Sequence, residues 1–145
     1  MTSSLAAYYS HELDEWRDVL HFHVMEIEEF EGWLNEVLQH NTVPNLAAKT
    51  EHFFSAFAGQ RHQLEGLAGQ VYALQNQLVK DKQPISDELI TPAIEDSHKA
   101  LREQMLQSEK KFLELKYECH QFLADTLGRQ SKGKQKGAGD NGAKE

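Results

Sequence analysis

The sequence predicts an all-α fold: an up-down-up, coiled-coil-like bundle of three long antiparallel helices. Apolar residues recur at alternating steps of three and four in three long segments, which is the pattern of packed amphipathic helices. Only three prolines occur in 145 residues, so long uninterrupted helices are possible. The segments are joined by short stretches, and short connections make long neighbouring helices run antiparallel. We therefore expect one domain, a helical bundle over residues 1–128.

The first helix is expected over residues 5–40. Nine of its positions follow the core pattern and eight of these are apolar, the exception being His23. The stretch HNTVPN follows, in which Thr42 is a good N-cap and Pro44 fits the first turn of a new helix. The first helix should therefore end near residue 40.

The second and third helices are expected over residues 43–80 and 86–128. Between them, Pro84 is a helix stop and Ser86 a helix N-cap. Pro92 lacks the backbone donor that a continuing helix uses, so we expect a kink or a short preliminary turn near residue 91.

The net charge of −8 is unevenly distributed. Between Glu12 and Glu36 there are nine acidic residues and one basic residue, Arg17, which disfavours nucleic acid as a partner. Residues 129–145 carry five basic and two acidic residues without apolar periodicity, so a disordered basic tail is predicted. Such a tail is either a solvated end or a contact for nucleic acid or for the acidic first helix.

No stretch has the length and hydropathy of a signal peptide or a membrane helix, so the sequence predicts a cytoplasmic protein with no membrane partner. The single cysteine, Cys119, lies at a core position and is expected to be buried and unreactive. There is also no glycine-rich phosphate-binding loop. We therefore expect a protein that is not an enzyme, with no catalytic residues.

The stretch LHFHVMEIEEFEGW has two histidines and four glutamates, the residue types of a metal site. His21 and His23, however, are two residues apart and so are turned by about 200° around a helix. In addition, no core position of the three helices is Asp or Glu, whereas metal-carboxylate bundles need inward glutamates. We expect neither a metal site nor a cofactor.

His23 instead belongs to a predicted buried polar layer. Counting outward from the expected turns sets His23 opposite Gln60, with Met105 and Ser108 nearby. A hydrogen bond between His23 and Gln60 would satisfy both groups and penalise a slipped register. His98 is expected near Trp16 as a partly exposed residue at the end of the bundle.

A set of positions in the first two helices resembles a family of small, uncharacterised, all-helical bacterial proteins: Trp16, Leu20, Asn41, Thr42, Glu51, His52, Phe53, Phe57, Gln60, Arg61 and Leu64. The similarity implies the helical fold. It implies no activity, because the family has none assigned.

Two sets of residues lie off the core positions and predict a protein interface. Glycines inside a helix cost about 1 kcal/mol each, so the stripe formed by Gly59, His62, Gly66 and Gly69 suggests a close helix contact. The large apolar residues Phe22, Met25 and Trp33 on the first helix suggest another.

Together these sets predict a homodimer and an unidentified protein partner. The leading hypothesis is therefore a non-enzymatic interaction or scaffold protein that self-associates. The alternative is a helical bundle that binds a metal or small ligand around His23, Gln60 and Glu26.

Overall fold

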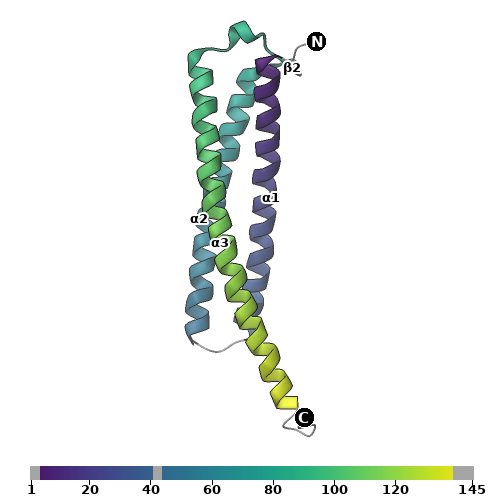
Figure 1. Cartoon of the computed structure of the whole chain (residues 1–145), viewed down its shortest axis with the longest axis vertical. Helices are drawn as coiled ribbons and strands as arrows, with labels where there is room; N and C mark the ends of the chain where they lie inside the picture. Colours follow the sequence, from purple (N-terminus) through teal and green to yellow (C-terminus); the bar gives the residue numbers. More distant parts are fainter. Residues whose placement is uncertain (1–3, 41–43, 139–145) are drawn as a thin grey trace.

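The computed structural model describes residues 4–40 and 44–138, which form three long helices (Figure 1). These are α1 (Leu5–His40), α2 (Pro44–Leu78) and α3 (Pro92–Ala138). α2 runs antiparallel to α1, and α3 returns in the direction of α1. The predicted all-α, up-down-up three-helix bundle is confirmed. None of the described helices combines the length and the hydropathy needed to cross a membrane.

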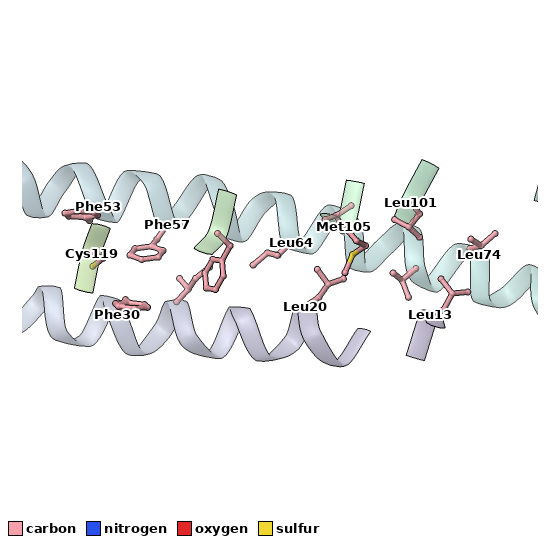
Figure 2. Packing of buried hydrophobic residues seen from close by; sticks show 14 of the residues in the cluster. Leu13, Leu20, Phe30, Phe53, Phe57, Leu64, Leu74, Leu101, Met105 and Cys119 are labelled. Carbon is pink, nitrogen blue, oxygen red and sulfur yellow. The ribbon is translucent and has the colours of Figure 1, made fainter. Parts of the chain in front are cut away.

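The core lies between the three helices at the predicted heptad positions. Figure 2 shows side chains of α1 and α2 pointing toward one another, including Leu20 and Phe30 from α1 and Phe57 and Leu64 from α2. The rings of Phe30 and Phe57 stack with centroids 5.2 Å apart. Because these side chains recur every three and four residues, one continuous apolar core joins the helices.

The α2–α3 connection contains a small hairpin that the sequence does not predict. Strand β1 (Val79–Lys80) pairs antiparallel with β2 (Gln83–Pro84). Asp81 and Lys82 at its tip both have positive φ, 51° and 65°, as a two-residue hairpin turn requires. Aspartate tolerates this conformation better than most residues, but the pair Asp-Lys is not a strong turn signal.

The sequence predicts a kink or turn near residue 91. Here the structure has a short 3₁₀ helix, η1 (Asp87–Leu89), separated from the start of α3 at Pro92. The Thr91 hydroxyl accepts the backbone N–H of Ile94 at 3.1 Å and so caps α3. Pro92 takes the first helical position, where no backbone donor is needed.

Asp87 holds the beginning of α1. Its two carboxylate oxygens accept the backbone N–H groups of Leu5 and Ala6, each at 3.0 Å. These hydrogen bonds lower the pKa of the Asp87 carboxyl. A residue assigned from the sequence to the first turn of the third helix therefore caps the first helix and ties it to the α2–α3 connection.

α3 continues to Ala138, beyond the predicted boundary at residue 128. Residues 129–138, placed in a disordered tail by the sequence, are helical and project past the end of α1 and the start of α2 (Figure 1). Adding a residue to an existing helix gains one backbone hydrogen bond, and Lys and Gln are good helix formers. Residues 139–145 lie outside the described residues, so the prediction for them stays open.

We predict that Asp87→Asn lowers the thermal midpoint of unfolding at pH 7, because the uncharged amide has one acceptor oxygen and can accept only one of the two α1 N–H groups. Glu88→Gln is the matched control, since Glu88 is exposed and adjacent. The folded-state pKa of Asp87 is lowered, so its contribution is present at neutral pH and is lost as the pH falls through that value. Equal midpoints for the two variants, measured by circular dichroism, would contradict the capping role.

Candidate functional site between the first and third helices

A partly buried network of charged and polar groups joins α1 to α3 around His23, which is 7% exposed. The His23 Nδ1 lies 2.9 Å from a carboxylate oxygen of Glu26, and its Nε2 lies 2.7 Å from Glu109 on α3. Lys116, also on α3, donates to the other oxygen of Glu26. The imidazole ring packs on Phe112 with centroids 4.3 Å apart. We call these residues, His23, Glu26, Glu109 and Lys116, the His23 network.

The predicted hydrogen bond between His23 and Gln60 is wrong, although both side chains are buried. Both ring nitrogens of His23 are engaged by carboxylates, which are stronger acceptors than an amide. Gln60 turns instead to α3, where its Nε2 donates to the backbone and hydroxyl oxygens of Ser108 at 3.3 Å each. The spacing of Glu26, three residues after His23, was the available signal for the true partner.

The Glu26 carboxyl remains charged at neutral pH. Burial by itself would raise its pKa, but the hydrogen bonds from Lys116 and His23 outweigh this and lower the pKa. A buried carboxylate with two donors is therefore a stable charged group that links two helices.

A second network joins the same two helices through Glu12, nearer the beginning of α1. One Glu12 oxygen lies 2.8 Å from His98 Nε2 and accepts from Arg102 at 2.6 Å. Burial would raise the pKa of Glu12, but hydrogen bonds from Arg102 and His98 lower it overall. The two networks thus place charged contacts along the α1–α3 boundary.

His98 is only 1% exposed, so the prediction of partial exposure is wrong. Its neighbour is as predicted, because the ring lies 5.1 Å from that of Trp16, and Tyr9 stacks on it at 4.0 Å. Two aromatic rings from α1 cover the imidazole and exclude water from it. His98 lies near the start of α3, and its burial is in keeping with a structural role.

A groove of about 430 Å³ lies between α1 and α3 beside the His23 network. Its polar edge is made by the Glu26–Lys116 pair, and His120 packs edge-on against Phe30 at 4.8 Å. The lining residues are Glu26, Glu29, Phe30, Trp33, Lys116, His120, Leu123, Ala124 and Leu127. Most of these are apolar, so the groove suits an apolar group better than a strongly charged one.

Within residues 4–40 and 44–138, no group of three or more His, Cys, Asp or Glu side chains is arranged to hold a metal ion. Gln60 does not join His23 and Glu26, so the alternative ligand set built on these three does not converge. Cys119 is buried, and burial raises the pKa of its thiol to about 12. The thiol is therefore protonated at neutral pH and is a poor nucleophile.

The residues of the predicted interface divide between two surfaces. Phe22 and Trp33 on α1 are 58% and 50% exposed. At about 100° per residue, both are turned by roughly 180–200° from Glu31, which contacts Arg61 of α2. They therefore face away from α2, with Met25 at the edge of the same surface.

The glycine stripe lies elsewhere, on α2. Gly66 is nine residues from Gln75, which donates to Asp14 of α1, and so faces away from α1. Gly59, His62 and Gly69 are exposed on the same surface. A Cβ added at any of the three glycines meets nothing within 4 Å, so nothing in the described chain approaches them closely.

No known protein family, characterised protein or solved structure matches this chain in sequence or fold comparisons. Function is therefore inferred from the residues and contacts described above.

We predict that Glu26→Gln lowers the free energy of unfolding by about 1–2 kcal/mol at pH 7, because the amide keeps only one acceptor oxygen and so loses one of the two hydrogen bonds together with the negative charge. The folded-state pKa of Glu26 is lowered, so its contribution is present above the unfolded-state value of about 4.3 and is lost as the pH falls. The variant should therefore lose less stability than the parent between about pH 5 and pH 3.

Urea unfolding at several pH values measures this difference, with Glu28→Gln as the control because Glu28 is exposed on the same helix. If Glu26→Gln and Glu28→Gln unfold alike at every pH, the His23 network does not stabilise the fold.

Proposed function

We propose that this protein is a non-enzymatic interaction protein, a helical scaffold that self-associates. The observation that supports the proposal is a set of large apolar side chains exposed on the surface of α1 and α3 that faces away from α2. On α1 these are Phe22 and Trp33, and on α3 they are Leu106 and Leu113, which are 59% and 49% exposed.

The positions of the two α3 leucines follow from the contact between α3 and α2. Ser108 accepts a hydrogen bond from Gln60 of α2, and Leu106 and Leu113 are turned by about 160° and 140° from Ser108. They therefore lie on the same side of the bundle as Phe22 and Trp33. We call this surface of α1 and α3 the outer face.

Exposed large apolar side chains are common singly, but a set gathered on one surface indicates a contact with another molecule. The interior of the bundle already contains a continuous core, so these residues are not needed to complete the fold.

The glycine stripe of α2 is the second surface that a partner helix could use. Glycines permit close approach of two helix backbones, but they supply little apolar area to bury. The outer face offers four large side chains instead, so we place the contact between copies there.

We predict that light scattering gives a dimer mass for the parent protein and a monomer mass for Phe22→Asp, because a buried carboxylate in the contact would be costly. Gly66→Leu should stay dimeric, since its side chain extends into open space in the monomer. Circular dichroism must show that both variants keep the helicity of the parent.

A monomer mass for Gly66→Leu with a dimer mass for Phe22→Asp would move the contact to the glycine stripe. A parent protein that is monomeric at all concentrations would refute self-association.

A second candidate function is the binding of a small apolar ligand. It is favoured by the groove between α1 and α3, because about 430 Å³ is within the usual size of small-molecule sites. We predict that an environment-sensitive apolar dye binds there with a 1:1 stoichiometry and that Ala124→Phe, which fills the groove, abolishes the fluorescence change. Tyr72→Phe on α2 is a control, and equal dye binding by all three proteins would exclude the groove.

A further inference from the structure

The α1 and α3 halves of the outer face differ in charge. The α1 half carries Glu15, Asp18, Glu29 and Glu36 together with its apolar residues, and no lysine or arginine. Asp18 lies 3.9 Å from Arg17 and Glu15 lies 3.8 Å from His11, whereas Glu29 and Glu36 form no ion pair within the part of the chain that the structure describes. This half is therefore acidic around Phe22 and Trp33.

The α3 half has lysines at its centre. Lys99 and Lys110 are turned by about 180° and 200° from Ser108, the residue that contacts α2, and they alternate with Leu106 and Leu113. Glu95 and Glu103 lie on the same side, each turned by about 140° from Ser108, as Leu113 is, so this half is close to neutral. An acidic apolar strip and a lysine-bearing apolar strip thus lie side by side on one surface.

The His23 and Glu12 networks show which residues of the two strips lie level with one another along the bundle axis. Glu12 contacts His98 and His23 contacts Glu109, and in both pairs the two residues are 86 apart in the sequence. Glu26 and Lys116 are 90 apart. A residue of α1 therefore lies level with the residue of α3 that is 86 to 90 positions later.

Two arrangements of a symmetric dimer are possible on this face. A two-fold axis perpendicular to the helices places α1 against α1 of the other copy and brings the acidic strips together. A two-fold axis parallel to the helices places α1 over the partner's α3, and it leaves every residue at its own height. Like charges directly opposed weaken an interface, so the charge pattern selects the parallel axis.

We infer that a second copy of this chain docks on the outer face with α1 over the partner's α3, about a two-fold axis parallel to the helices. The inference rests on the proposed self-association and specifies its surface. Phe22 is then level with residues 108–112 and packs between the partner's Leu106 and the partner's Leu113. Asp18 is level with residues 104–108 and reaches the partner's Lys110.

The outer face is large enough for such a contact. From Tyr8 to Trp33 the helix rises about 38 Å, and two helices side by side are about 20 Å wide. The product is about 750 Å², close to the roughly 800 Å² that each partner buries in a stable interface.

The experiment is a charge exchange at Asp18 and Lys110, followed by light scattering over a range of concentrations. In the inferred dimer the contact between residue 18 of one copy and residue 110 of the other occurs twice by symmetry. In Asp18→Lys both contacts bring two lysines together, and in Lys110→Glu both bring two carboxylates together. Each variant alone should raise the dimer Kd at least about tenfold. An equimolar mixture should recover dimer, because both charge contacts of the mixed dimer are again between opposite charges.

Matched controls are the neighbouring reversals Glu28→Lys and Lys111→Glu, which are exposed on the same helices but turned away from the outer face. The controls should leave the Kd unchanged, and all variants should keep the helicity of the parent, since Asp18 is 79% exposed in its side chain.

Three results would overturn the inference while self-association stands: dimers that persist in both charge variants, equal weakening by the controls, or a mixture that does not recover dimer. A parent protein that is monomeric throughout would instead refute the proposed function itself.

Discussion

Charged contacts between α1 and α3 constrain the register of the third helix on the other two. Apolar side chains at heptad positions allow several registers, because one leucine layer resembles the next. A carboxylate such as Glu26, held by His23 and Lys116, has no equivalent partner one turn away. A slip by one turn would leave Glu26, whose side chain is 12% exposed, without its donors, which is unfavourable. Glu12 and Glu26 therefore favour the observed register of α3.

This division of roles explains the surface as well as the fold. α1 and α2 are joined by stacked apolar side chains such as Phe30 and Phe57. The α1–α3 boundary is instead joined by long charged side chains at the two networks, beside the mostly apolar groove. Phe22 and Trp33 are exposed beside that boundary, and Trp33 also lines the groove. The contacts that join α3 to α1 therefore also fix the relative position of the apolar and charged side chains on the outer face.

A rigid surface is an advantage for binding, because little conformational freedom is lost when a partner docks. The hydrogen bonds of Asp87 to the start of α1 contribute to this rigidity at one end, since they join the first helix to the α2–α3 connection. The bundle is therefore stabilised by the Asp87 cap at the end where the α2–α3 connection lies, and by the His23 and Glu12 networks along its length. These features support the proposed scaffold role.

The sequence by itself determined the three helices and the core, because apolar periodicity is a local property that directly reports which face of a helix is buried. It also determined that His23, Gln60 and Cys119 are inside, since each occupies a heptad position. Only the tertiary structure decided their partners. His23 contacts Glu26 and Glu109 instead of Gln60. Asp87 caps the first helix through residues 82 and 81 positions away, and Tyr9 covers His98. Long side chains at the edges of the core reach across helices in directions that the pattern of one helix does not contain.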